Sequence, residues 1–221
     1  SGARAKQGLR VQDKNAVVIP QVTVSVEQYN RIFRQINAGI PVKVSLDLKT
    51  TYTNPSGMEY NIIAEIPGTD LKDEIVMFGA HFDSWHSATG ATDNAAGSSV
   101  MIEAARILLE TIKESGIPPR RTLRLALWTG EEQGLLGSRA YVNKHLVTRD
   151  TNNTIREIHP EQGKISAYYN LDNGTGKIRG IYLQGNEQVA PSFRSWLDAF
   201  KDLGATTLSL QNTGGTDHLS F

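Results

Sequence analysis

Three continuous apolar runs in the middle of the chain place the strongest constraint on its fold. They are EIVMFGA (residues 74–80), TLRLALW (122–128) and ISAYYNL (165–171), and helical stretches separate them. Strands that are apolar along their whole length are typical of parallel sheets covered on both faces. The chain is therefore predicted to belong to the α/β class. Two weaker runs, IRGIYL (178–183) and TTLSL (206–210), are expected to add further strands.

Helical periodicity appears between and before these runs. Residues 94–115 carry an apolar stripe opposite a charged one, and Gly116 supplies a usual stop. Residues 189–203 repeat the pattern and end at Gly204, and residues 26–37 form a shorter amphipathic helix.

Two strand predictions precede the first buried run. Residues 42–52 and 60–66 alternate apolar and polar side chains around the turn sequence NPSG (54–57), which predicts a β-hairpin with one half-exposed face. We expect this hairpin to form one flank of the main sheet. Residues 16–24 are predicted to form a separate short strand.

Charge and composition exclude several classes of function. The chain has 23 Lys plus Arg and 23 Asp plus Glu, so no basic excess would hold nucleic acid or an anionic membrane. No apolar run approaches the roughly 20 residues that cross a bilayer. Because cysteine is absent, disulfides and thiolate metal ligands are excluded. A small neutral substrate or a protein partner fits better, and the oligomeric state stays open.

Acidic residues and histidines gather directly after the predicted strands. The residues in these positions are His81, Glu131, Glu132, Asp172, Asp217 and His218. The carboxyl ends of the strands in an open α/β sheet line one crevice, where ligands bind. We therefore expect these residues, although far apart in the chain, to converge on one site built from separate loops.

The side chains at this edge favour a metal site. Imidazole nitrogen and carboxylate oxygen, without sulfur, suit zinc first and also cobalt or manganese. Such a set exceeds the needs of one four-coordinate zinc, whereas two metals about 3.5–4 Å apart, bridged by a carboxylate, would use all of it. Asp93 is the natural bridge, because it lies in GATDNAAG (90–97), whose small side chains let backbone approach the ions. Taken alone, Asp93 could instead cap the following helix.

The motifs and their order resemble peptidase family M28, a family of zinc peptidases. The matching stations are HFD (81–83), DNAAG (93–97), EEQG (131–134), Asp172 and the pair Asp217 and His218. Within the family, DSW (83–85) and RTLRLALWT (121–129) look closest to the carboxypeptidase Q group and its bacterial relatives. The resemblance implies a three-layer αβα sandwich with a mixed, mostly parallel sheet, of the zinc exopeptidase, phosphorylase/hydrolase-like kind.

The resemblance also implies how the metals are held. His81 and Asp172 would bind one zinc ion, Glu132 and His218 would bind the other, and Asp93 would bridge the two. Each chain would therefore carry two zinc ions, with cobalt or manganese as possible substitutes.

Two further carboxylates are implied to serve the reaction without binding metal. Asp83 would accept the second N–H of the His81 ring, as metal-bound imidazoles usually require. Glu131 would act as the general base that activates water and then protonates the leaving amine. Because adjacent residues normally point in opposite directions, Glu131 and Glu132 can divide these tasks if the turn after Gly130 is irregular.

The expected activity is metal-dependent hydrolysis of peptide bonds at chain ends, by an aminopeptidase or a dipeptidase. Two alternatives stay open. One is a glutaminyl cyclase-like acyltransferase that uses a single zinc on the same scaffold, and the other is a binding homologue without catalysis. The presence of every ligand position and of Glu131 argues against the second alternative. The resemblance further implies that the full-length protein is secreted or periplasmic.

The resemblance also divides the chain. Residues 1–41 resemble the end of an inserted protease-associated domain, and residues 42–221 resemble the catalytic domain, truncated at its C-terminus. Family members continue past the position of Phe221 with a strand and a helix that support the last ligand. We therefore expect His218 to hold its metal weakly, so that the chain as given is only partly metallated.

Overall fold

The computed structural model describes residues 17, 22–49, 51, 57–86, 88–172 and 176–221, which form two compact units, residues 1–58 and 59–221. In the first unit, α1 (Val26–Asn37) is the amphipathic helix that its periodicity predicted, and Tyr29 and Phe33 stack on one face. Of the strand expected over residues 16–24, residues 17 and 22–24 lie in no strand, and the others fall outside the described residues.

The predicted hairpin is not present in the part of the chain that the structure describes. Residues 42–49 and 51 form no strand, and residues 50 and 52–56 lie outside the description. Instead, β1 (Ile62–Ile66) pairs in antiparallel fashion with β3 (Arg121–Trp128). Alternating polarity predicts which face of a strand is buried, but it carries no information on which strand supplies the hydrogen bonds.

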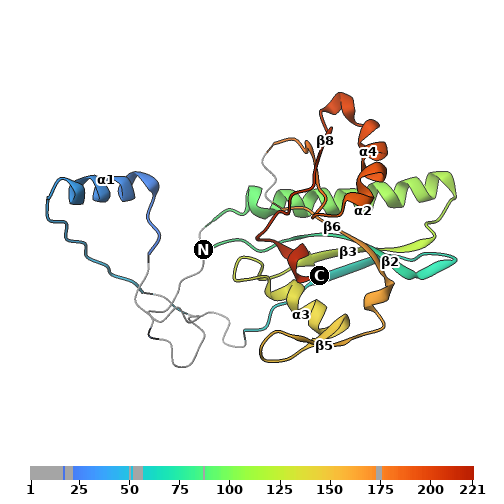
Figure 1. Cartoon of the computed structure of the whole chain (residues 1–221), viewed down its shortest axis with the longest axis horizontal. Coiled ribbons are helices and arrows are strands. Elements are labelled where there is room, and N and C mark those ends of the chain that lie inside the picture. The colour runs from blue at the N-terminus through green and yellow to red at the C-terminus, as the bar shows by residue number, and fades with distance from the viewer. Residues whose placement is uncertain (1–16, 18–21, 50, 52–56, 87, 173–175) are drawn as a thin grey trace. The chain divides into compact units, whose positions relative to one another are not determined.

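The main sheet has the strand order β1-β3-β2-β6. β2 (Leu71–His81), β3 and β6 (Ile165–Asn170) run parallel, and β1 makes the sheet mixed. The register pairs His81 with Trp128, and Gly79 with Asn170. The carboxyl ends of the parallel strands therefore meet at one edge of the sheet (Figure 1).

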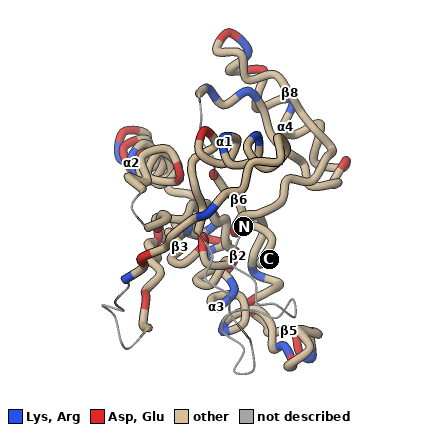
Figure 2. Tube along the Cα trace, turned by 90° about the vertical axis from the view of Figure 1, so that its left-hand side faces the viewer, with Lys and Arg blue, Asp and Glu red and all other residues tan. Residues whose placement is uncertain are grey.

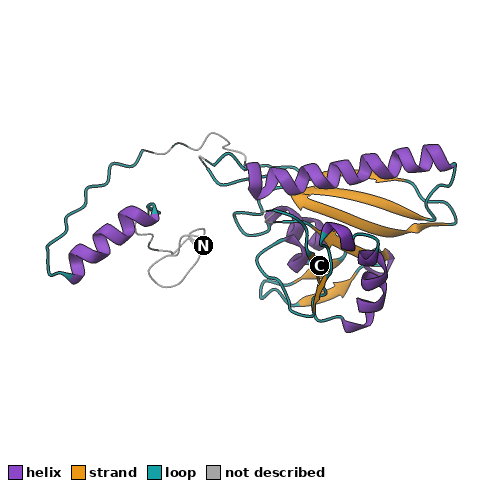
Figure 3. Cartoon of the chain, turned by 90° about the horizontal axis from the view of Figure 1, so that it is seen from above, coloured by secondary structure: helices purple, strands orange, loops and turns teal. Residues whose placement is uncertain are grey.

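Helices cover both faces of this sheet, as the continuous apolar runs predicted. α2 (Gly97–Ser115) lies along one face and α3 (Leu136–His145) lies on the other (Figures 1 and 3). On the α2 face, the packed side chains are those of Phe78, Leu125, Leu127, Met101, Ala104 and Ala105. On the α3 face, they are those of Met77, Ala126, Trp128, Tyr141 and Val142. The result is a three-layer αβα arrangement.

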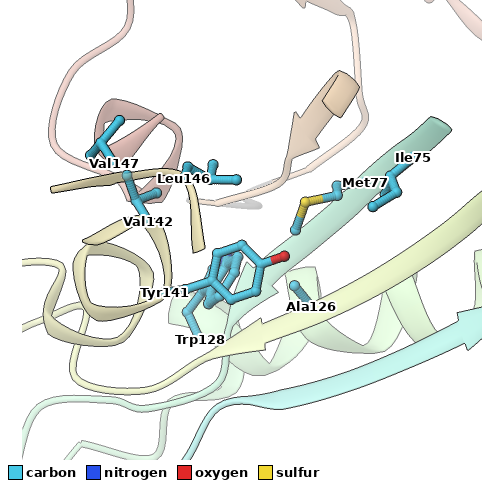
Figure 4. Close-up of a cluster of buried hydrophobic side chains, with 8 residues drawn as sticks. All are labelled: Ile75, Met77, Ala126, Trp128, Tyr141, Val142, Leu146 and Val147. Carbon is cyan, nitrogen blue, oxygen red and sulfur yellow. The ribbon is translucent and has the colours of Figure 1, made fainter. Parts of the chain in front are cut away.

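Trp128 lies in the packed core of the α3 face, at the end of β3. Its side chain is fully buried, and its ring centroid is 5.2 Å from that of Tyr141 and 6.3 Å from that of Tyr168. Figure 4 shows the Tyr141 ring directly beside the indole, with Met77 on the neighbouring strand β2 and Ala126 on β3 itself. The last residue of β3 thus anchors α3 to the sheet beside the edge where the strands end.

Other elements lie outside the main sheet. They are β4 (Val147–Arg149) antiparallel to β5 (Ile155–Ile158), β7 (Gly180–Tyr182) parallel to β8 (Thr207–Ser209), α4 (Ala190–Asp198), and the 3₁₀ turns Gln162–Lys164, Glu187–Val189, Lys201–Leu203 and Asp217–Ser220. The predicted stop at Gly116 (φ 66°) is confirmed, because this residue ends α2 in left-handed backbone. The helix predicted over residues 189–203 is wrong in its end, since α4 stops at Asp198 and Gly204 (φ 85°) instead ends the 3₁₀ turn Lys201–Leu203.

Charges of both signs alternate on the outward face of α2. Glu103 pairs with Arg106, and Glu110 pairs with Lys113, each three residues along the helix (Figure 2). Such pairs contribute only a few tenths of a kcal/mol each, and they give the helix no net basic surface. Among the described residues, no helix is both long and apolar enough to cross a membrane.

Replacing Trp128 with alanine should destabilise this fold strongly. We expect a loss of about 3–5 kcal/mol in the free energy of unfolding, because a fully buried aromatic side chain is removed and a cavity is left. Trp196→Ala is the matched control, since that side chain is 54% exposed, and about 1 kcal/mol or less is expected. Urea unfolding followed by circular dichroism measures both, and equal losses would contradict the assigned core.

Candidate metal centre

His81 is the last residue of β2, and its imidazole is enclosed at the carboxyl edge of the sheet with 1% of its side chain exposed. The Ser98 hydroxyl of α2 donates a hydrogen bond of 2.8 Å to the His81 carbonyl oxygen. On the ring, Nδ1 lies 3.2 Å from the Asp83 carbonyl oxygen and 3.4 Å from Asp83 Oδ1. These contacts orient the other ring nitrogen, Nε2, toward the loops that follow the strands.

Carboxylates from three other segments surround His81 Nε2. Asp93 Oδ1 is 3.1 Å away, Asp172 Oδ1 is 3.2 Å away, and Glu131 Oε2 is 4.0 Å away. One ligand atom each from His81, Asp93 and Asp172 lie within 4.8 Å of one another. The Asp172 side chain is 6% exposed and that of Asp93 is 48% exposed, so the cluster is closed toward the sheet and open toward Asp93.

Asp93 reaches the cluster through an irregular segment. A π-helical turn, Ala91–Ala96, precedes α2, and Asp93 (φ −116°, ψ 91°) and Asn94 interrupt it with non-helical backbone. The peptide bond between these two residues is cis. Because Asp93 and Asn94 have non-helical backbone angles, the helix predicted from residue 94 begins at Gly97, and the Asp93 side chain does not cap it.

The buried Asn94 ties the Asp93 loop to the Asp172 loop. Its side-chain Nδ2 donates to the Leu171 carbonyl oxygen at 3.0 Å, and its Oδ1 accepts from the Gly97 N–H at 3.1 Å. A Cβ atom on Gly97 would lie 2.2 Å from Asn94 Oδ1, which only glycine avoids. One asparagine thus holds together two segments that each deliver a carboxylate to the cluster.

Asp83 holds the turn that carries the two adjacent glutamates. Its Oδ1 accepts the Glu131 N–H at 3.1 Å, and its Oδ2 accepts the Glu132 N–H at 3.2 Å. Burial opposes the charged form of Asp83, but hydrogen bonds from His81 and from these two backbone groups leave its pKa below the ordinary value. The turn is irregular, as expected, since Gly130 (φ 63°) and Leu135 (φ 61°) adopt left-handed backbone.

The crowding of carboxylates changes the acidity of the groups in the centre. Burial disfavours a charged His81, yet hydrogen bonds that its ring donates to Asp172 and Asp83, with the charges of Asp172 and Glu131, raise the pKa of His81 to about 11. Burial, reinforced by the charges of Asp172, Asp217 and Glu132, raises the pKa of Glu131 to about 7. The centre therefore attracts positive charge, and its buried glutamate is a base matched to neutral pH.

Two of the predicted ligands stand apart from the tight group. Burial, followed by the charge of Asp93, raises the pKa of Glu132. No oxygen of Glu132 joins the group formed by His81, Asp93 and Asp172. His218 lies in the 3₁₀ turn Asp217–Ser220, and its Nε2 is 2.9 Å from the Thr213 carbonyl oxygen. The structure thus brings together the ligands expected for one ion more closely than those expected for a second.

Asp217 is the acidic residue that sequence reasoning placed at the edge without giving it a role. It is fully buried, and neither carboxylate oxygen has a hydrogen-bond partner. Burial raises its pKa to about 6, the nearby Ser138 hydroxyl and the charge of His81 oppose the rise, and the charges of Asp172 and Asp83 add to it. Its position directly before a predicted ligand was the only signal in the sequence, since burial of a carboxylate depends on packing.

The residues present fit a divalent cation. A buried carboxylate without a partner, beside a histidine whose Nε2 faces further carboxylates, leaves negative charge that a cation would neutralise. Nitrogen and carboxylate oxygen, without sulfur, are zinc ligands in catalytic sites. A hollow of about 620 Å³ elsewhere on this unit, lined by Lys72, Arg124, Tyr141 and Lys164 among others, includes none of the predicted site residues.

Known proteins resemble this chain in sequence. It is 33% identical to carboxypeptidase Q of Bos taurus over 210 residues, which are 95% of this chain and 40% of that protein. It is 30% identical over 173 residues to leupeptin-inactivating enzyme 1 of Streptomyces exfoliatus, covering 77% of this chain and 35% of that protein. The chain spans about two fifths of the length of the carboxypeptidase Q relatives that it matches.

Solved structures resemble it in fold. A peptidase M28 precursor from Shewanella amazonensis superposes with a TM-score of 0.67 at 25% identity, covering 95% of this chain and 43% of that one. BSAP, a zinc aminopeptidase from Bacillus subtilis, gives a TM-score of 0.53 at 30% identity, covering 73% of this chain and 36% of that one. The sequence profile of family M28 matches residues 61–221, which contain every residue of the centre described above. This chain belongs to peptidase family M28, as its motifs predicted.

Proposed function

We propose that this chain is the metal-binding and catalytic part of a zinc exopeptidase that hydrolyses peptide bonds at chain ends. The observation that carries the proposal is the convergence of His81 Nε2, Asp93 and Asp172 on one point, with the buried Glu131 carboxylate 4.0 Å from that nitrogen. The name of the similar Bacillus subtilis protein, a zinc aminopeptidase, supports zinc as the metal and a chain end as the site of cleavage.

Two zinc ions per chain are proposed. His81 and Asp172 would hold one, Glu132 and His218 would hold the other, and Asp93 would bridge them. Bound zinc would supply Lewis acidity toward the scissile carbonyl and would make an attacking water more acidic. Support for the first set is geometric, whereas support for Glu132 and His218 comes from the family motifs and from their place at the same edge of the sheet.

Glu131 is proposed as the general base. Its side chain is 9% exposed, and its raised pKa lets it accept a proton from water near neutral pH and return it to the leaving amine. The backbone N–H groups of Glu131 and Glu132 are both held by Asp83, which fixes the turn between the base and the proposed ligand. Asp83 also lies beside His81 Nδ1, so it orients the imidazole and the glutamates together.

The substrate is proposed to be a peptide or dipeptide, and the whole protein is proposed to be secreted or periplasmic. We also propose that residues 1–41 end an inserted protease-associated domain and that residues 42–221 belong to the catalytic domain. A single-zinc glutaminyl cyclase remains the main alternative, because it would use the same scaffold.

Replacing Glu131 with glutamine should slow hydrolysis strongly and leave zinc binding unchanged. Glutamine keeps the size of the side chain but cannot accept the proton, so kcat on peptide substrates should fall by about 10²–10⁴-fold. Glu132→Gln is the matched control, because loss of a ligand should lower the zinc content itself. Wild-type turnover by the Glu131 variant with full zinc would exclude this residue as the base.

Replacing Asp83 with asparagine should weaken metal binding about 10–100-fold. Asparagine offers one acceptor oxygen where the carboxylate accepts two N–H groups, so its own NH₂ would face a backbone donor. Asp73→Asn, an exposed change on β2 away from this turn, serves as the control. Competition with a chromogenic chelator measures zinc affinity, and indistinguishable values for the two variants would contradict the role given to Asp83.

The zinc content and the product together separate the peptidase from the cyclase. We expect up to two zinc ions per chain on titration, with release of free amino acids from peptides. Elemental analysis of the titrated protein and amino-acid analysis of the reaction measure these quantities. A single zinc, with ammonia released from amino-terminal glutamine, would establish the alternative instead.

A further inference from the structure

A chain of hydrogen bonds links the core of the sheet to the loop that carries Asp217 and His218. The Trp128 indole N–H donates to the Tyr168 hydroxyl at 2.6 Å. The Tyr168 hydroxyl donates to Asn170 Oδ1 at 2.6 Å, and Asn170 Nδ2 donates to Thr216 Oγ1 at 2.9 Å. Every link runs in one direction, from β3 through β6 to a segment more than forty residues further along the chain.

The two ends of this chain are well defined. At one end Trp128 is fully buried in the packed core of the sheet. At the other end Thr216 is 6% exposed and directly precedes Asp217, the fully buried carboxylate whose oxygens lack a hydrogen-bond partner. A buried carboxylate without a partner is costly unless a cation lies close to it. The series of hydrogen bonds from Trp128 to Thr216 therefore holds the residue before this buried carboxylate in place beside the metal centre.

Asn170 also stands close to the ligands in sequence. It is the last residue of β6, two positions before Asp172, so one strand end delivers both a ligand to the cluster and the amide that holds Thr216. Asn170 uses its oxygen as acceptor and its NH₂ as donor, which a side chain with only one of these functions cannot do.

Ring contacts and one hydrogen bond also hold this segment. The Phe221 ring lies 4.5 Å from that of Tyr168 and 6.0 Å from that of Trp128, measured between centroids. The Ser220 and Ser138 hydroxyls are 2.7 Å apart. These contacts anchor the segment after His218, whereas the amide of Asn170 anchors it immediately before Asp217. Loss of the Thr216 hydroxyl would therefore free one side of the segment without detaching it.

We propose that Asn170 and Thr216 are positioning residues, which set the affinity of the centre for its second metal by fixing the Asp217 and His218 segment without touching the metal. The inference rests on the proposed two-zinc function, in which His218 is a ligand. In this proposal, a second layer of residues surrounds the proposed ligands, and it connects them to the core through the Trp128 and Tyr168 side chains.

Zinc titration of the metal-free full chain by calorimetry tests the inference. Thr216→Val removes the hydroxyl while keeping the shape of the side chain. It should lower the affinity for the second zinc ion about 10–100-fold and leave the affinity for the first unchanged. Thr216→Ser restores a hydroxyl and should bind both ions within about threefold of the wild type, a rescue that a general loss of stability would not give. Tyr168→Phe, which retains the ring and leaves Thr216 unchanged, should also lower the affinity for the second zinc ion. This variant serves as the test if Thr216→Val does not fold.

The outcomes separate the two proposals. Two zinc ions in the wild type, with selective loss of the second in Thr216→Val and recovery in Thr216→Ser, support the inference. Two zinc ions in the wild type and unchanged affinities in Thr216→Val and Tyr168→Phe overturn the inference and leave the proposed function standing. A wild type that binds only one zinc at millimolar metal overturns both. Equal weakening of both ions also overturns the inference, because it would show a general structural effect.

Discussion

The structure depends on the concentration of negative charge around one buried imidazole. His81 lies at the end of a central strand, and the carboxylates of Asp93, Asp172 and Glu131 all face its Nε2. Like charges at such distances repel one another, and burial removes the water that would screen them. A rigid surrounding fold and positive charge at the centre both stabilise this arrangement, and a divalent cation would supply the positive charge.

Rigidity comes from the way in which each loop is tied to another loop rather than only to its own strand. Asp83, after β2, holds the turn after β3 through two backbone N–H groups. Asn94, before α2, holds the carbonyl of Leu171 after β6. Because these ties cross between segments, the relative positions of the carboxylates are set by buried hydrogen bonds, which exposed ion pairs such as Glu103 with Arg106 could not provide.

The two halves of the proposed dinuclear site differ in how they are supported. The ligands of the first ion extend directly from the parallel strands and from the Asn94 tie, and they already converge. The segment with Asp217 and His218 follows β8, which lies in a separate small sheet with β7, and it reaches the centre through side-chain contacts with Asn170 and Tyr168. A ligand held in this way is more sensitive to changes at a distance from the metal.

Much of this arrangement was readable from the sequence, because it depends on short-range pattern. Apolar runs along their whole length required strands buried on both faces, and the positions of His81, Glu131 and Asp172 directly after those runs required them to share an edge. The tertiary structure alone decided which strand pairs with β1, that α2 begins at Gly97, and that Asp217 is buried without a partner. These features follow from hydrogen-bond pairing and packing between distant segments, and neither polarity nor periodicity within a segment encodes them.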